Sequence, residues 1–170
     1  MTGLPKYIHL RLHTEYSLLE GAVRLKKLPG MCSANHMPAI AVTDTNNLFS
    51  ALEFSVLFKD QGLQPIIGCQ IDLKFTDKMP EKRSSNNAPI VLLAQNEVGY
   101  KNLMKLSSEM YVQNSVEQVE ISIEQLENYS GVVVVVHYTS ENEGRTLTSE
   151  VRQAKNIEKR VEIRSYKSEG

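Results

Sequence analysis

The stretch Ala39-Ile40-Ala41-Val42-Thr43-Asp44 is a short apolar run that ends in two polar residues. A helical pattern follows over residues 47–60, and Gly62 marks its end. The next apolar run opens at Gln64-Pro65-Ile66-Ile67-Gly68. Strand, helix and strand in this order predict a βαβ unit with parallel strands and a right-handed crossover.

The same alternation continues on both sides of this unit. Five consecutive valines, Val132 to Val136, are typical of a strand buried on both faces, as in a parallel sheet covered by helices. Together these patterns predict an α/β fold, either a barrel or an open doubly wound sheet. The remaining predicted elements are strands at residues 7–13 and 90–94, an extension of the second strand to residue 75, and helices at 22–36, 97–113 and 122–129.

The chain changes character near residue 139. Glu, Arg, Lys and Ser dominate residues 139–170, and apolar residues are sparse there. We therefore divide the chain into one domain over residues 1–138 and a charged tail over residues 139–170. Within the tail, the pattern predicts a helix at 147–159 and a strand at 160–166.

Composition excludes several classes of protein. The chain has 170 residues, 41% of them hydrophobic, as expected for one globular domain. With 19 Lys and Arg against 20 Asp and Glu, it lacks the positive charge of an autonomous nucleic-acid-binding protein. Cys32 and Cys69 have no metal-type spacing, which favours free thiols in a cytoplasmic protein. No apolar run approaches the ~18 residues of a membrane helix, so no membrane association is expected.

Residues with metal-ligand side chains gather where the first two strands are predicted to end. His9 and His13 lie on the polar face of the first strand, Glu20 follows it, and Asp44 ends the second. Catalytic and ligand-binding residues of α/β folds lie at the carboxyl ends of parallel strands, so these side chains are candidates for one site. Such a set could hold a divalent cation of the kind that hydrolyses phosphoesters.

A series of short motifs surrounds these strand ends. They are His9-Leu10-Arg11-Leu12-His13-Thr14-Glu15-Tyr16-Ser17, Leu19-Glu20-Gly21, Met37-Pro38-Ala39, Thr43-Asp44, Pro65-Ile66-Ile67-Gly68, Leu92-Leu93-Ala94-Gln95-Asn96 and Gly99-Tyr100-Lys101-Asn102-Leu103. In order and spacing they resemble the PHP domain of bacterial DNA polymerase III alpha subunits. The resemblance covers residues 5–136, about the first half of that family's PHP domain, and the family's whole polymerase is several times longer than this chain.

The resemblance implies the first part of a distorted (β/α)7 PHP barrel, TIM-barrel-like, with parallel strands and crossover helices. Metal-binding members hold a cluster of ions there and, in some bacteria, remove 3′ nucleotides. Here the site looks degenerate: His13, Glu20 and Asp44 are vestigial metal-site positions, and Arg11 replaces one histidine of the family's first pair. Other ligand positions are also changed, with Thr45 in place of a histidine, Gln70 in place of an acid and Pro89 in place of a histidine.

A fixed positive charge at this place opposes metal binding. A guanidinium keeps its proton in proteins, so Arg11 beside His13 puts a cation where a dication would lie. At ~4 Å and an effective dielectric constant of about 20, the repulsion is on the order of 8 kcal/mol. We therefore expect no metal or other cofactor, and we expect Arg11 to block the site or to pair with Asp44 or Glu20. Capping of the following turn and helix is the alternative role for Asp44.

The resemblance then implies a function. The chain is predicted to be an N-terminal PHP-domain fragment of the replicative, DNA-directed DNA polymerase III alpha subunit, with a scaffolding role in DNA replication. That family is a nucleotidyltransferase, but this chain has no Asp-x-Asp pair and is expected to be inactive alone. Its expected partners are the remainder of the alpha subunit and other replisome proteins, with DNA bound through the parent enzyme. The alternative is an active metal-dependent phosphoesterase or 3′-5′ exonuclease, which would need a divalent metal.

Overall fold

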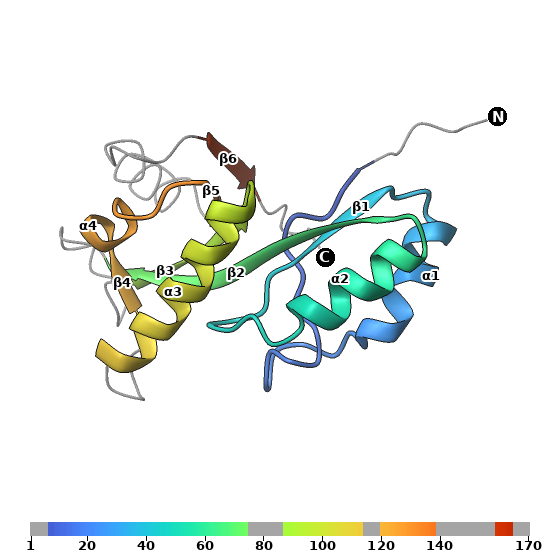
Figure 1. Cartoon of the computed structure of the whole chain (residues 1–170), viewed down its shortest axis with the longest axis horizontal. Coiled ribbons are helices and arrows are strands. Elements are labelled where there is room, and N and C mark those ends of the chain that lie inside the picture. The colour runs from blue at the N-terminus through green and yellow to red at the C-terminus, as the bar shows by residue number, and fades with distance from the viewer. Residues whose placement is uncertain (1–6, 75–86, 114–119, 139–158, 165–170) are drawn as a thin grey trace, which may run out of the picture. The chain divides into compact units, whose positions relative to one another are not determined.

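The computed structural model describes residues 7–74, 87–113, 120–138 and 159–164, which are drawn in colour in Figure 1. The chain divides into two compact units, Met1–Cys69 and Gln70–Gly170. Strand β2 (Gln64–Lys74) contributes residues to both. Within the described residues, no helix is long and apolar enough to cross a membrane.

The N-terminal unit contains the βαβ arrangement that the sequence predicts. Strand β1 (Ala39–Val42) pairs in parallel with the first part of β2, from Ala39 opposite Gln64 to Val42 opposite Ile67. Helix α2 (Ala51–Asp60) forms the connection between them, as Figure 1 shows. All four residues of β1 are buried, as expected for a strand covered on both faces.

The apolar core of this unit joins α2 and β1 to two short helices, η1 (Leu25–Lys27) and α1 (Leu28–Ala34). Phe54 and Phe58 project from successive turns of α2, and their ring centroids lie 4.3 Å apart. Burial of such a side chain contributes roughly 1.5–3 kcal/mol to stability. The core residues are Leu25, Leu28, Cys32, Met37, Ile40, Val42, Phe54 and Phe58.

Residues 7–13, predicted to form the first strand, run along β1 but form no regular strand. Two backbone hydrogen bonds join the segments: Ala41 N–H donates to the His9 carbonyl at 2.8 Å, and Thr43 N–H donates to the Leu12 carbonyl at 2.9 Å. The acceptors are three residues apart and the donors only two, so the register slips and a regular ladder cannot form. The Thr43 hydroxyl compensates, because its Oγ1 accepts from Leu12 N–H at 2.9 Å.

Two predicted helices begin later than their sequence patterns indicate. The helix predicted at 22–36 is found as η1 followed by α1, because Pro29 in the first turn of α1 cannot donate a hydrogen bond to an earlier turn. Helix α2 begins at Ala51 rather than residue 47. There the Asn47 side chain accepts from Phe49 N–H at 3.1 Å, and this local bond competes with the helical pattern.

The C-terminal unit is a sheet with one long helix. Within it the strand order is β2-β3-β5-β6, and β4 pairs with β2. Helix α3 has the predicted bounds, and the predicted short helix α4 ends at Leu126 rather than near residue 129. The elements are β3 (Asn87–Ala94), α3 (Glu97–Gln113), β4 (Glu120–Ser122), α4 (Ile123–Leu126), β5 (Val132–Tyr138) and β6 (Lys159–Arg164).

The prediction of parallel strands throughout is wrong for this unit. The valine strand β5 runs antiparallel to β3, from Ala94 opposite Val132 to Ile90 opposite Val136. It runs parallel to β6 on its other side. A run of valines indicates burial but carries no information about the direction of the neighbouring strands. The fold is therefore α/β with a mixed sheet.

Part of the predicted tail is ordered structure. The strand predicted at 160–166 is found as β6, Lys159–Arg164, hydrogen-bonded to β5. The helix predicted at 147–159 lies outside the described residues, apart from Lys159, which begins β6.

Candidate functional site

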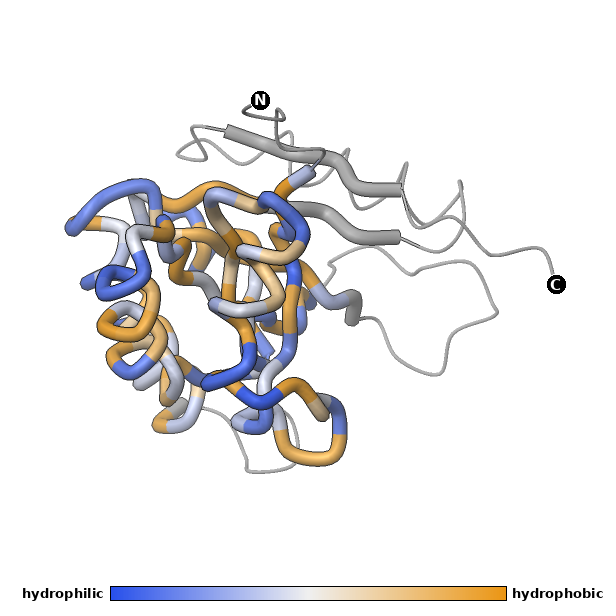
Figure 2. Tube along the Cα trace, turned by 90° about the vertical axis from the view of Figure 1, so that its right-hand side faces the viewer, coloured by the Kyte–Doolittle hydropathy of each residue, from blue (hydrophilic) through white to orange (hydrophobic). Residues whose placement is uncertain are grey.

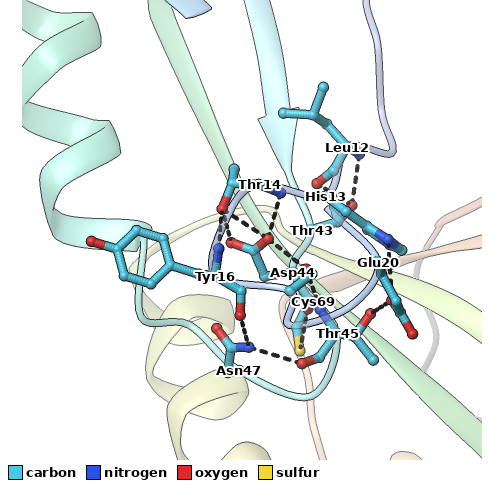
Figure 3. A network of polar contacts seen from close by, with 11 residues as sticks. Leu12, His13, Thr14, Tyr16, Glu20, Thr43, Asp44, Thr45, Asn47 and Cys69 are labelled. Atoms are coloured by element: carbon cyan, nitrogen blue, oxygen red, sulfur yellow. Dashed lines mark hydrogen bonds and ion pairs between the residues drawn. The ribbon is translucent and has the colours of Figure 1, made fainter. Parts of the chain in front are cut away.

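The carboxylate of Asp44, just after β1, is the centre of a buried hydrogen-bond network (Figure 3). Asp44 is only 1% exposed. Its Oδ1 accepts from the Thr14 backbone N–H and from the Ser17 hydroxyl, both at 2.7 Å. Its Oδ2 accepts from the Ser50 hydroxyl at 2.6 Å, and the Thr14 hydroxyl lies 3.0 and 2.8 Å from the two oxygens. We call Thr14, Ser17, Asp44 and Ser50 the Asp44 cage.

The cage forms because the chain folds back sharply after Thr14. Ser17 N–H donates to the Thr14 carbonyl at 3.0 Å, and Gly21 N–H donates to the Ser17 carbonyl at 2.9 Å. Thr14 also forms an isolated parallel bridge with Val23. A Cβ atom on Gly21 would lie 1.9 Å from the Thr14 carbonyl oxygen, so the close approach of these two segments requires glycine.

A second polar group lies beside the cage and is more exposed. His13 Nδ1 is 3.3 Å from Glu20 Oε2, and the Thr45 hydroxyl donates to the same oxygen. The side chains of His13 and Glu20 are 16% and 47% exposed, so this partly solvated contact contributes at most about 1 kcal/mol. Thr45 N–H donates to Ser17 Oγ at 3.1 Å and links this group to the cage (Figure 3).

Cys69 is buried next to Asp44 and contacts its backbone. Its Sγ lies 3.4 Å from the Asp44 backbone carbonyl, to which the thiol donates. Burial raises the pKa of the Cys69 thiol to about 12, so the thiolate is not populated near neutral pH. A nucleophilic or metal-binding role needs the thiolate, and we assign Cys69 a packing role instead.

The geometry of these groups does not fit a metal ion. Both oxygens of Asp44 already accept hydrogen bonds, from three hydroxyl groups and one backbone N–H, and a cation would have to displace those donors. The exposed Glu20 is shared by an imidazole and a hydroxyl. Among the described residues, no three His, Cys, Asp or Glu side chains are grouped in a way that could hold a metal.

The structure brings some of the sequence-predicted site residues together. His13 and Glu20 are in contact, and Asp44 lies in the adjoining cage. His9 instead packs edge-on against Tyr7, with ring centroids 4.8 Å apart. Arg11 is half-buried in the extended segment, and its pairing with Asp44 or Glu20 stays a prediction.

Sequence reasoning missed the residues that actually surround Asp44. Thr14, Ser17 and Ser50 are uncharged, and a search for metal ligands passes over them. The available signal was the Thr14 and Ser17 hydroxyls, directly after the predicted first strand. Gln70 and Pro89, which the resemblance predicts to be changed ligand positions, belong to the C-terminal unit, where Gln70 is buried.

Comparisons with known proteins agree with the motifs. The family model described as PHP domain matches residues 9–165. DNA polymerase III subunit alpha of Campylobacter jejuni is 41% identical over 127 residues, and that of Rickettsia felis 38% identical over 145 residues. These matches cover 75% and 84% of this chain but only 11% of each relative. A solved amidohydrolase structure from Chromobacterium violaceum shares the fold, with a TM-score of 0.64 and 11% identity over 90% of this chain and 75% of its own. The chain belongs to the PHP domain family.

Proposed function

We propose that this chain forms the PHP portion of a bacterial replicative DNA polymerase alpha subunit and acts there as a scaffold in the cytoplasm. Family membership and the identity to two DNA polymerase III alpha subunits support this role. The remainder of the subunit and other replisome proteins are its partners, and DNA is bound through the parent enzyme. The βαβ unit is the first part of a (β/α)7 barrel in this proposal.

The observation that carries the scaffolding role is the Asp44 cage. Hydrogen bonds to a charged group contribute roughly 1.5–3 kcal/mol each, because the carboxylate is a strong acceptor in a buried setting. The cage connects the turn after the extended segment, the end of β1 and the start of α2. The Asp44 carboxylate thus crosslinks three parts of the N-terminal unit through hydrogen bonds.

The positive charge of Arg11 also opposes the binding of a metal ion. Arg11 precedes His13 by two residues in the extended segment. A permanently charged guanidinium in this neighbourhood lowers the affinity for any dication. We therefore include no metal or other cofactor in the proposal.

Metal content and nuclease activity together test the scaffold against an active phosphoesterase. The chain is expressed with added zinc and manganese, dialysed, and analysed by mass spectrometry for bound metal. It is then incubated with a 3′-labelled oligonucleotide and each cation. We expect far less than stoichiometric metal and no release of labelled nucleotide. Stoichiometric metal together with nucleotide release that His13→Ala abolishes would replace the scaffold by the phosphoesterase.

A chimera tests the link to the polymerase. The matching segment of the Campylobacter jejuni alpha subunit is replaced by residues 9–136 of this chain, and primer extension is measured. We expect extension to persist, because a scaffold needs the fold and not a particular active site. A folded chimera that binds primer and template but fails to extend it would count against the proposed role.

A further inference from the structure

Helix α2 is apolar on two opposite faces. Ala51, Phe54 and Phe58 are buried and form the inner face of the helix. Leu52 and Val56 are 77% and 52% exposed. With about 3.6 residues per turn, Leu52 and Val56 share one face, roughly opposite the buried one. Figure 2, coloured by hydropathy, shows apolar residues in orange along the helices. We call Leu52 and Val56 the outer face of α2.

This pattern is typical of a helix that is buried on all sides. A surface helix carries polar side chains opposite the core, whereas a helix that is apolar all round lies in the interior of a larger protein. The charged residues of α2 are confined to its ends, with Glu53 in the first turn and Lys59 and Asp60 in the last two positions. The Ser55 hydroxyl donates to the Ala51 carbonyl at 2.7 Å, so the helix itself satisfies this polar group. An apolar centre with a polar rim is also the usual composition of a protein interface.

The remainder of the parent subunit is the polypeptide best placed to cover this face. The chain matches only 11% of the length of each of the two alpha subunits, so most of their polypeptide lies outside the matched part. A segment of the same polypeptide reaches the face at a far higher effective concentration than a second copy does. Helices form the outer ring of a (β/α) barrel, so their outer faces are left for parts of the protein beyond the barrel.

We propose that the outer face of α2 packs against an apolar surface of the remainder of the alpha subunit. This docking rests on the proposed function, because its occupant belongs to the parent polymerase. The occupant presents apolar side chains to Leu52 and Val56. It presents polar side chains at the edge, where Glu53, Lys59 and Asp60 lie.

Thiol labelling measures whether the face is covered. Leu52→Cys is made in the chain alone and in the Campylobacter jejuni chimera that carries residues 9–136. The native Cys32 and Cys69 are buried, and mass spectrometry of the peptide that contains position 52 excludes cysteines of the Campylobacter jejuni part. The maleimide reaction at position 52 should be at least about tenfold slower in the chimera than in the chain alone. Lys26→Cys, at an exposed charged position of η1, is the control and should react equally fast in both.

Val56→Cys repeats the test one turn later on the same face and should be slowed in the same way. An active chimera in which both positions react as fast as in the chain alone would overturn this docking and leave the proposed function intact. A folded chimera that cannot extend a primer would overturn the proposed function and this docking with it.

Two other results would assign the face differently. Slow reaction at positions 52 and 56 already in the chain alone would show that a second copy, or another part of this chain, covers the face. Equal slowing of Lys26→Cys in the chimera would show general crowding of the surface rather than coverage of α2. Either result would overturn the proposal.

Discussion

Replacement of Asp44 by Asn should cost about 4 kcal/mol of unfolding free energy. The carboxylate accepts from three hydroxyls and one backbone N–H, so four charge-assisted hydrogen bonds are affected. A charge-assisted bond contributes roughly 1.5–3 kcal/mol and a neutral one roughly 0.5–1.5, a loss of about 1 kcal/mol for each of the four. The new amide also places a donor opposite hydroxyls that were donating to the carboxylate. Small domains have only about 5–15 kcal/mol of stability, so this variant should be severely weakened.

Urea unfolding followed by far-UV circular dichroism measures this loss. The midpoint should fall strongly while the urea dependence stays constant, as expected for a change in stability alone. Glu15→Gln makes the same acid-to-amide change at an exposed position and should change stability by no more than about 0.5 kcal/mol. A loss below about 1 kcal/mol for Asp44→Asn, similar to that control, would show that the cage does not hold the unit together.

Three further predictions use other features of the chain. Gly99→Ala should lower the melting temperature strongly, because its Cβ would lie 1.8 Å from the Gly131 carbonyl oxygen. The control Gly30→Ala in α1 should raise the melting temperature slightly, because its Cβ would meet nothing within 4 Å and alanine favours the helix. The free energy of unfolding should fall as the pH rises from about 8.5 toward 12. In this range the Cys69 thiol ionises in the unfolded chain, whereas burial raises its pKa to about 12 in the folded chain and keeps it protonated. The decline should be shallower in Cys69→Ala, which has no thiol to ionise. Arg11→Met should lower the melting temperature if the guanidinium pairs with a carboxylate at the strand ends, and an unchanged value would remove that prediction.

Local patterns predicted most elements of the fold. The apolar run at 39–42 and the helix Glu97–Gln113 are found with the predicted bounds, because their patterning and end signals agree. The segment 7–13 has equally clear alternation but fails to form a strand. Its failure comes from the slipped register against β1, which depends on a partner 31 residues away and cannot be read from the segment itself.

The residues of the candidate site could also be predicted only in part from the sequence. His13, Glu20 and Asp44 were found from side-chain type and strand-end position, since these follow from the order of elements. The hydroxyl donors Thr14, Ser17 and Ser50 gain their role only because a sharp turn at Gly21 and the start of α2 bring them to one carboxylate. Uncharged hydroxyl residues cannot be recognised as site residues in the sequence until the carboxylate to which they donate is known.

By itself, the sequence determined the α/β class and the PHP family motifs. These depend on residue identity and short spacing, which the chain carries directly. Only the tertiary structure decided that β5 runs antiparallel to β3, that Asp44 is held by hydroxyls, and that Leu18 and Leu19 face solvent. Strand direction, hydrogen-bond partners and exposure depend on contacts between distant segments, and no local pattern encodes those contacts.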